Sequence, residues 1–281
     1  MASIGLRRFV RKALLSVPPR VRRPLEIRLL RSYEAYLRLR APRAQAVDAL
    51  DALPLPPTKL RVLVSGTADA GFFLASGREQ AAHVRSMLSR HDVSLSGMSI
   101  LDFGCGCGRI TRWWEDVEGP KVFACDPHPA LAGWCRSNLP FADVVVSGDN
   151  PPLPYPDAAF DFVYALSIFT HLPEDRAVRW MTELRRVIRP GGLLLFTTAG
   201  DSYRERLNES DQHAYDAGRP IVQFDTAAGT NLCIAYHPPA YVRGPMTESF
   251  DLLEAYLAAE HPQEAERASL IQDSYLVRRA A

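Results

Sequence analysis

Residues 100–110, ILDFGCGCGRI, run from a short apolar segment through Asp102 into three glycines at alternate positions, Gly104, Gly106 and Gly108. A parallel strand that ends in glycines and opens a helix brings backbone N–H groups and the positive end of the helix to one point. Such a point suits a carboxylate or a phosphate. The stretch therefore predicts a ligand-binding loop at the carboxyl end of a strand.

The spacing of the glycines indicates which ligand to expect. A dinucleotide fingerprint, G-x-G-x-x-G, that starts at Gly104 needs glycine at position 109, where the chain has Arg109. The chain instead carries D-x-G-x-G-x-G, from Asp102 to Gly108. This pattern argues against a dinucleotide loop.

From residue 60 onward, short apolar runs alternate with helical patterns. This alternation predicts an α/β domain with a doubly wound, mostly parallel sheet of seven strands. The clearest helix is 174–189, and RPGG at 189–192 is expected to end it, because proline and glycine cannot continue a helix. The other expected helices are 77–91, 109–116 and 128–138, and the expected strands are 98–103, 121–125, 143–147, 160–166, 192–198, 250–256 and 274–279.

Charge divides the chain into two parts. Residues 1–43 hold twelve Lys and Arg against two Glu, a local balance of +10, so the remainder carries −9. LPLPPTKL at 53–60 is typical of a stiff proline-rich connector. We predict a basic helical extension over 1–57 and a main domain over 58–281, with an insertion at about 201–245 after the fifth strand.

The basic extension begins with IGLRRFVRKALL, in which apolar side chains share one helical face and basic side chains the other. Three interpretations of this amphipathic helix stay open. It packs on the main domain, it contacts an anionic membrane surface or an acidic partner, or it is an organelle-targeting segment.

The five cysteines indicate a reducing compartment, because their number is odd and their spacing forms no disulfide framework. We expect a cytoplasmic protein. The basic extension also allows the protein to associate with the surface of a membrane. No run of the sequence reaches the length of a membrane span, and ALL at 13–15 is too short for a secretory signal. A zinc site is disfavoured, since structural zinc sites prefer tightly paired cysteines. The cysteines are Cys105, Cys107, Cys125, Cys135 and Cys233.

The glycine stretch ILDFGCGCGR resembles motif I of the class I S-adenosylmethionine-dependent methyltransferases. The similarity extends over residues of about 96–200, and ELRRVIRPGGLLLFTT at 183–198 is similar to the helix, turn and strand of that family. The resemblance implies a Rossmann-like fold, methyltransferase activity (EC 2.1.1.-) and S-adenosyl-L-methionine as cofactor. It implies cofactor contacts at the loop residues Asp102, Phe103, Gly104, Gly106 and Gly108.

The two cysteines inside the loop, Cys105 and Cys107, occupy variable positions of the motif. Small side chains suit a loop that a ligand crosses closely, and we interpret both residues as fillers of space. A redox-sensing role is the alternative, because helix N-termini lower the pKa of a thiol.

Two acidic positions further along the chain support a nucleoside ligand. Asp126, followed by Pro127 in VFACDPHP, ends the second strand, where a carboxylate can accept hydrogen bonds from both ribose hydroxyls; a helix N-cap is the alternative role. The resemblance places Asp149, with Asn150 beside it, at the adenine amino group, although Gly-Asp-Asn-Pro is also a strong turn signal. Leu166 is also expected at the cofactor.

Methyl transfer from a sulfonium is a direct displacement, so the protein must chiefly align donor and acceptor and exclude water. A base is needed only when the acceptor carries a proton that must leave. His171, in ALSIFTHLPED at 165–175, is the candidate base; a histidine that ties this loop together is the alternative.

Acceptor recognition is expected from segments around the core. Phe72 and Phe73 are candidates for a lid, and Tyr203, Tyr236 and His237 are candidates within the insertion. VQFDTAAGTNLCIAYHP in the insertion predicts a hairpin with its turn at AAGTN. Aromatic residues among a few polar groups suit a half-apolar small molecule, and they equally suit a covering flap.

We therefore expect methyl transfer to an O, N or C atom of a small-molecule, glycan or lipid-linked acceptor. A SAM-binding regulatory or scaffold protein without transferase activity is an alternative. A nucleic-acid methyltransferase is disfavoured, because the body is acidic and ALSIFTH stands where an N-P-P-Y-type tetrapeptide would act on a base. The sequence makes no prediction of the acceptor atom or the oligomeric state.

Overall fold

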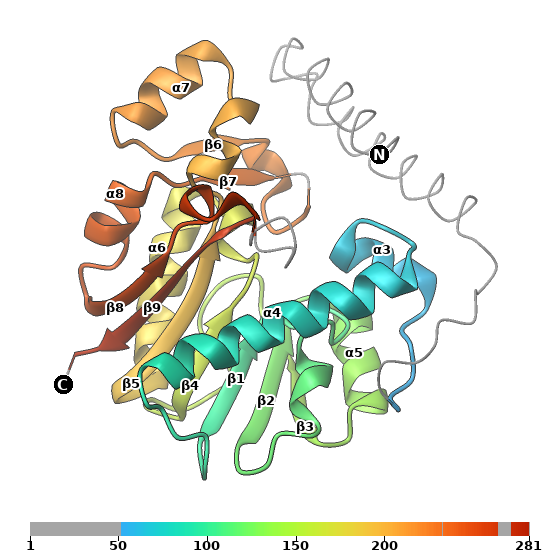
Figure 1. Ribbon diagram of the computed structural model, residues 1–281. Coiled ribbons are helices and arrows are strands. Elements are labelled where there is room, and N and C mark those ends of the chain that lie inside the picture. The colour runs from blue at the N-terminus through green and yellow to red at the C-terminus, as the bar shows by residue number, and fades with distance from the viewer. Residues whose placement is uncertain (1–51, 232, 264–270, 281) are drawn as a thin grey trace. The chain divides into compact units, whose positions relative to one another are not determined.

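The apolar run before the glycines forms β1 (Ser99–Phe103), an interior strand of the main sheet. The computed structural model describes residues 52–231, 233–263 and 271–280, in which the strand order is β3-β2-β1-β4-β5-β9-β8 (Figure 1). Only β9 runs against its neighbours in this sheet, so the predicted mostly parallel sheet of seven strands is confirmed. The other strands are β2 (Lys121–Asp126), β3 (Ala142–Val146), β4 (Phe160–Ala165), β5 (Ile188–Thr198), β8 (Phe250–Tyr256) and β9 (Asp273–Arg279).

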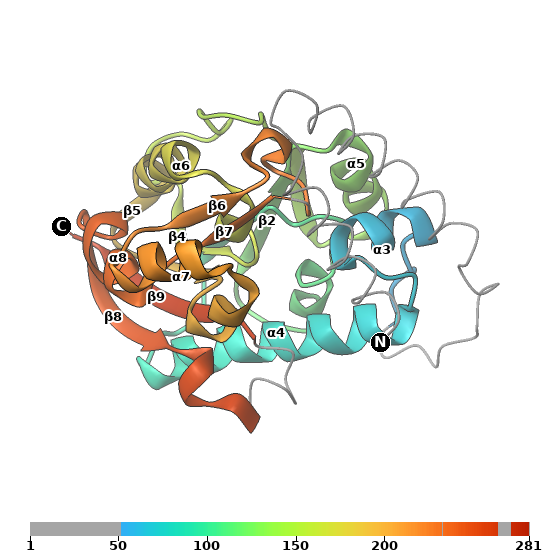
Figure 2. The same cartoon turned by 90° about the horizontal axis from the view of Figure 1, so that it is seen from above.

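Helices cover both faces of the sheet (Figures 1 and 2). α4 (Ala70–Arg90) and α5 (Pro129–Asn138) pack on one face, and α6 (Glu174–Val187) packs on the other. The alternation of side chains along β1 produces this arrangement, because Ile100 joins the core under α4 and Leu101 joins the core under α6. Because these strands run parallel, their carboxyl ends lie at the same edge of the sheet.

Two predicted helices differ from the observed ones. The helix predicted over 77–91 begins earlier, at Ala70, because the side chain of Asp69 caps it by accepting the N–H of Phe72 at 3.1 Å. The α-helix predicted over 109–116 is wrong. Turns and a one-turn 3-10 helix, η1 (Thr111–Trp114), occupy this segment. Arg112 and Trp114 are both buried instead of lining one face of a helix, and Trp114 stacks on Tyr164 with ring centroids 5.9 Å apart.

The segment RPGG ends α6 as predicted, since the helix stops at Val187. The glycines lie inside β5, however, and not in a turn before it. The pairing of β4 with β5 shifts between Phe160 and Phe162, and a side chain on Gly192 would place its Cβ 2.9 Å from the carbonyl of Asp161. Gly192 therefore allows β4 and β5 to approach closely at this bulge, where a side chain would not fit.

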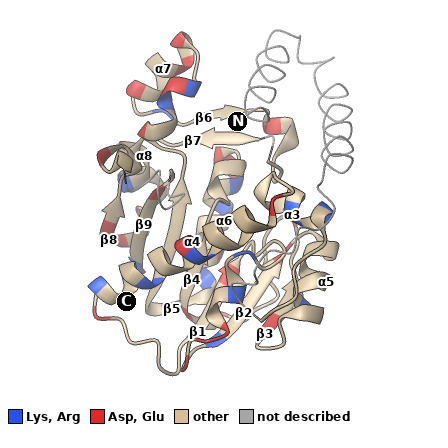
Figure 3. Ribbon diagram, turned by 45° about the vertical axis from the view of Figure 1, so that its right-hand side comes forward, with Lys and Arg blue, Asp and Glu red and all other residues tan. Residues whose placement is uncertain are grey.

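The insertion after β5 carries the predicted hairpin, formed by β6 (Ile221–Gln223) and β7 (Ile234–Tyr236). This hairpin is a separate two-stranded sheet, and an isolated bridge between Tyr236 and Ala199 joins β7 to the residue that follows β5. Figure 3 shows the acidic helix α7 beside basic residues of the same insertion, where Arg204 pairs with Asp216 at 2.6 Å. The remaining elements of this region are η3 (Asp201–Arg206), α7 (Glu209–Asp216), η4 (Asp225–Ala227), α8 (Pro239–Tyr241), η5 (Val242–Met246) and, after β8, η6 (Ala258–Glu260).

The proline-rich connector is attached to the domain that follows it. Arg112 donates from Nη2 to the carbonyls of Leu53 and Pro54 at 3.0 and 3.3 Å, and α3 (Thr58–Ser65) follows directly. Backbone contacts group the described residues into one unit. The basic extension over 1–43 and its amphipathic helix lie outside the described residues. None of the described helices combines the length and apolar character needed to cross a bilayer.

Candidate functional site

The glycine loop turns sharply at the carboxyl end of β1. Gly104, Gly106 and Gly108 all adopt positive φ angles, of 82°, 57° and 75°. The N–H groups of Gly104 and Cys105 both donate to the carbonyl of Cys125 in the adjacent β2, at 2.9 and 3.0 Å. The loop is thus fixed to the neighbouring strand by its own backbone, with glycine at each left-handed position.

Side chains from three other segments pack against these glycines, and at Gly108 an added Cβ would come within 2.6 Å of the Leu139 side chain. Ile168 covers Gly104, and Val64 of α3 lies over Gly106, where an added Cβ would come within 2.7 Å of the Val64 side chain. Gly106 and Gly108 are buried and Gly104 is half-buried. The predicted helix opening at the glycines is absent, since η1 starts only at Thr111, so the helix-dipole part of the prediction is wrong. Of the three glycines, Gly104 is the most accessible to a ligand.

Asp126 ends β2 beside the loop, as predicted. Its Oδ2 accepts the N–H of Gly106 at 2.9 Å and its Oδ1 accepts the N–H of His128 at 2.8 Å. The carboxylate is 7% exposed, and burial raises its pKa while the two backbone hydrogen bonds oppose that rise. The carboxylate joins two strand ends and also supports the start of α5, and each oxygen keeps acceptor capacity for a ribose hydroxyl.

Two loop residues predicted to contact the cofactor lie beneath the loop. Asp102 is buried and accepts the hydroxyl of Thr111 at 2.6 Å, and burial raises its pKa to about 6. Phe103 packs against Trp180 of α6 with ring centroids 4.8 Å apart, inside the core. In this structure both side chains therefore pack beneath the glycine loop and support it.

The other predicted cofactor residues lie at the same edge of the sheet. Pro127, Asp149 and Asn150 are exposed, following β2 and β3, and Leu166 is buried directly after β4. Exposure leaves the Asp149 and Asn150 side chains available to an adenine, and their role stays a prediction.

His171 lies in η2 (Phe169–His171), after β4. Its Nδ1 bonds the carbonyl of Cys233 at 2.7 Å and therefore carries the proton, because a carbonyl only accepts. Its own carbonyl accepts the N–H of Gly229 at 2.9 Å. These contacts match a histidine that ties the insertion to η2, and its role as a base stays a prediction.

The structure separates the predicted lid pair. Phe72 is 46% exposed, whereas Phe73 is fully buried in the cluster between α3, α4 and the loop. The pairing of both residues in one lid is therefore wrong, because consecutive helical residues point in different directions.

The insertion candidates are all buried. Tyr203 lies under the guanidinium of Arg206, 4.1 Å from its ring centre, and Tyr236 belongs to the apolar cluster of the insertion. His237 is 1% exposed, and burial lowers its pKa to about 4. Its backbone N–H donates to the carbonyl of Ala199, which brings it to the end of β5.

The cysteines of the loop are buried thiols. Burial raises the pKa of Cys107 far above its ordinary value, and the hydrogen bond with Cys135 is the largest cause of the rise at Cys105. The low pKa on which a redox role depends is therefore contradicted. Among the described residues, no group of three His, Cys, Asp or Glu side chains is arranged to hold a metal ion.

Three polar residues that the sequence reading missed meet at the ends of β4 and β5. Ser167 donates from its hydroxyl to Oε1 of Gln272 at 3.0 Å, and Thr197 donates to the same oxygen at 2.6 Å. No motif marks them, because Ser167 and Gln272 lie far apart in the chain and only the sheet brings them together.

The fold and the loop define a class of protein, the doubly wound α/β domains whose ligands lie outside the carboxyl ends of the strands. A profile of the family described as "Methyltransferase domain" matches residues 101–196, from β1 to β5. The segment from β1 to β5 is thus similar to a methyltransferase domain, and the sheet around it has the doubly wound form of such domains.

Curated relatives include the malonyl-[acyl-carrier protein] O-methyltransferase of Serratia marcescens, 30% identical over 177 residues, which are 61% of this chain and 64% of the relative. The sterol 24-C-methyltransferase of Gibberella zeae is 32% identical over 109 residues, 37% of this chain and 28% of the relative. The chain thus spans less than two thirds of the length of these relatives.

Solved structures show the same fold. The 1,6-didemethyltoxoflavin-N1-methyltransferase of Burkholderia thailandensis has a TM-score of 0.53 at 15% identity, covering 84% of this chain and 99% of its own. The PH0226 protein of Pyrococcus horikoshii has a TM-score of 0.52 at 16% identity, covering 73% and 91%.

Proposed function

We propose that the protein transfers the methyl group of S-adenosylmethionine to a small acceptor, and that a malonyl group on an acyl-carrier protein is the first acceptor to test. The observation that carries the proposal is the hydrogen bond between Gly106 and Asp126, which joins the glycine loop to the end of β2 within the matched segment. The names of several curated relatives support the choice of acceptor.

In this proposal the half-buried backbone at Gly104 faces the amino-acid end of the cofactor. The carboxylate of Asp126 accepts the ribose hydroxyls, and the exposed Asp149 and Asn150 reach the adenine. Bound S-adenosylmethionine supplies a methyl group already activated by its sulfonium. The chain then has to hold donor and acceptor in line and exclude water.

Calorimetric titration of S-adenosylmethionine tests the site. We expect Asp149→Ala to weaken binding about ten- to a hundredfold, since a hydrogen bond to a charged group contributes about 1.5–3 kcal/mol. Asp143→Ala is the matched control, because Asp143 is an exposed carboxylate on the adjoining β3. Equal binding by wild type and Asp149→Ala would remove the adenine role, and no binding by wild type would refute the proposal.

Formation of S-adenosylhomocysteine with malonyl-acyl-carrier protein tests the reaction. The same carrier loaded with an acetyl group lacks the free carboxyl and serves as the control acceptor. Cofactor binding without turnover of any oxygen, nitrogen or carbon acceptor would instead indicate the binding protein without transferase activity.

A further inference from the structure

The turn of the insertion hairpin contacts two elements outside the insertion. The N–H of Gly229 donates to the carbonyl of His171 in η2 at 2.9 Å, and Nδ2 of Asn231 donates to the carbonyl of Leu63 in α3 at 2.6 Å. Gly229 and Asn231 are near neighbours in the chain, so one short segment joins η2 to α3. We call this segment, residues 225–231, the strap.

The two elements that the strap joins are also the ones that cover the glycine loop. Ile168 directly precedes η2 and packs on Gly104, and Val64 follows Leu63 in α3 and packs on Gly106. In Figures 1 and 2 the hairpin of β6 and β7 lies above the carboxyl ends of the parallel strands. The strap therefore bridges the two covers at the ligand-binding edge of the sheet.

The strap is attached more firmly to η2 than to α3. His171 bonds the chain on both sides of Asn231, since its carbonyl accepts the N–H of Gly229 and its Nδ1 donates to the carbonyl of Cys233 at 2.7 Å. The contact with α3 is made by the side chain of Asn231, which is exposed. A hydrogen bond exposed to water exchanges readily for bonds to solvent, so we expect the α3 end to open first.

α3 itself is held in place independently of the strap. Arg61 donates from Nη1 to the carbonyl of Pro56 at 2.6 Å and from Nη2 to the carbonyl of Ala68 at 3.0 Å, so one side chain joins the segments before and after the helix. Leu60 is buried in the core cluster beneath α3. Leu63 lies in the last turn, where helix carbonyls lack an intrahelical donor and can accept from outside. Breaking the contact with the strap should therefore leave α3 folded.

We propose that the strap is a gate over the cofactor site and that the hydrogen bond between Asn231 and Leu63 is its latch. When the latch breaks, the strap can lift from η2 as well, on the arm that β6 and β7 form, and the cofactor enters or leaves. This inference rests on the proposed function, which places the amino-acid end of the cofactor at Gly104. The latch forms with and without the cofactor, and a contact that is equal in both states cancels from the binding equilibrium. It therefore sets the rates of cofactor exchange and leaves the affinity unchanged.

Stopped-flow fluorescence of the full chain tests the gate. Binding of S-adenosylmethionine gives the association rate, and its displacement by excess S-adenosylhomocysteine gives the dissociation rate. Trp113 packs against the cluster beneath α3 and serves as the reporter. Asn231→Ala removes the amide of the latch, and we expect both rate constants to rise about fivefold, the factor that one net hydrogen bond corresponds to. The Kd should stay within twofold of wild type.

Asn138→Ala is the matched control. Nδ2 of Asn138 also donates to a helix carbonyl, that of Trp134 at 2.8 Å, but it does so within α5. This variant should change neither rate constant. Unchanged rates in Asn231→Ala would overturn the inference. A weaker affinity that comes from faster release alone would overturn it as well, because Asn231 would then be a ligand of the cofactor.

Hydrogen–deuterium exchange measures the opening of the strap without the cofactor. We expect Asn231→Ala to speed exchange in the strap about fivefold, including the Gly229 N–H that is bonded to His171, and to leave exchange in α3 unchanged. Equal acceleration in α3 would show that the variant loosens the helix, and it would overturn the gate. Failure of the wild type to bind S-adenosylmethionine would instead refute the proposed function, and exchange in the strap would then decide the latch by itself.

Discussion

At the scale of single residues, Gly106 shows how the loop depends on the absence of a side chain. Its φ angle is +57°, and its position for a Cβ lies 2.7 Å from Val64 of α3. Two separable costs thus oppose any substitution: the left-handed backbone and the overlap with Val64.

A double-mutant cycle separates these costs. We expect Gly106→Ala to lower the free energy of unfolding by about 2–3 kcal/mol, of which about 1–2 kcal/mol is the backbone conformation. In a Val64→Ala background the overlap is relieved, so Gly106→Ala should cost only the backbone part. Urea unfolding of the four proteins measures the coupling. Strictly additive losses would show that Val64 does not press on the loop.

The residues predicted from motifs and those missed differ in how far their partners lie along the chain. Gly106 and Asp126 are hydrogen-bonded neighbours on adjacent strand ends, and a local pattern indicated both. The motif itself did not show that Phe103 points into the core, where it shares the face of Leu101 on β1 and packs against Trp180 of α6. Gln272 carried no signal, since its partner Ser167 is brought to it only by the order of the sheet.

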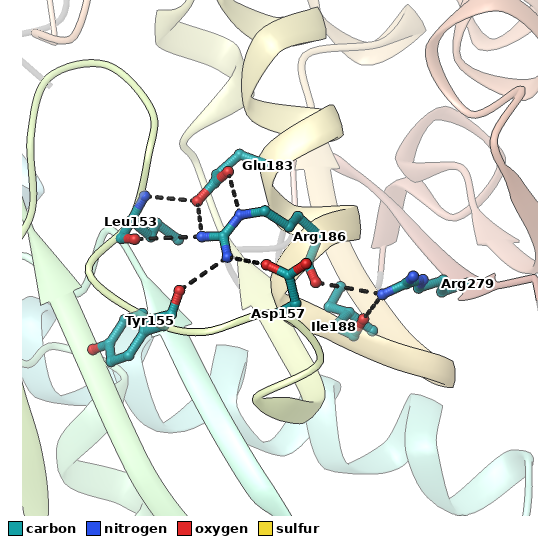
Figure 4. Close-up of polar contacts among 7 residues, drawn as sticks. All are labelled: Leu153, Tyr155, Asp157, Glu183, Arg186, Ile188 and Arg279. Carbon is teal, nitrogen blue, oxygen red and sulfur yellow. Dashed lines mark hydrogen bonds and ion pairs between the residues drawn. The ribbon is translucent and has the colours of Figure 1, made fainter.

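At the scale of elements, one arginine joins α6 to the segment between β3 and β4. Arg186 pairs with Glu183 at 2.6 Å and with Asp157 at 2.7 Å, and it donates to the carbonyl of Tyr155 at 3.0 Å (Figure 4). Glu183 is 6% exposed and also accepts the N–H of Leu153 at 2.6 Å. The network therefore holds the 153–157 segment, between β3 and β4, against α6.

We expect Arg186→Met to lower the free energy of unfolding by about 2–3 kcal/mol, because the buried carboxylate of Glu183 loses its counter-charge. Arg179→Met is the matched control on the same helix. Arg179 pairs with Asp175 at 2.9 Å, but both side chains are exposed, so a change below about 0.5 kcal/mol is expected. Equal effects of the two changes in urea unfolding would show that burial of Glu183 contributes nothing.

Elements with a strong period were predictable, and elements decided by tertiary contacts were not. The helix over 174–189 has an apolar stripe and clear end signals, and the structure places it at Glu174–Val187. The segment after the glycines has no such stripe. Arg112 is turned inward to bond the connector carbonyls, and Trp114 stacks on Tyr164. These long-range contacts favour a single 3-10 turn over an α-helix.

At the scale of the whole molecule, buried titratable groups with opposite pKa shifts set the response to acid. His83 of α4 is hydrogen-bonded through Nε2 to the hydroxyl of Ser274 in β9 at 3.0 Å, and burial lowers its pKa to about 4, with a further lowering from Arg90. Burial raises the pKa of Asp102 and of Asp273 to about 6. A histidine whose pKa is lowered by folding binds a proton more readily in the unfolded protein. The carboxyls of Asp102 and Asp273, whose pKa values are raised, bind a proton more readily in the folded protein.

The sign for His83 follows from linkage. Between pH 6.5 and 4 the unfolded chain takes up a proton at His83 that the folded chain does not, so acid removes stability in this window. A shift of this size corresponds to about 3 kcal/mol.

His83→Gln keeps a partner for Ser274 and cannot titrate. Asp102, Asp273 and His237 are present in both proteins, so their contributions cancel in the difference. We expect the stability of His83→Gln relative to wild type, measured by urea unfolding, to rise by about 2–3 kcal/mol from pH 7 to pH 4.5. A difference that stays constant over this range would mean that folding does not change the pKa of His83, and a neutral imidazole between α4 and β9 at pH 4.5 would then be ruled out.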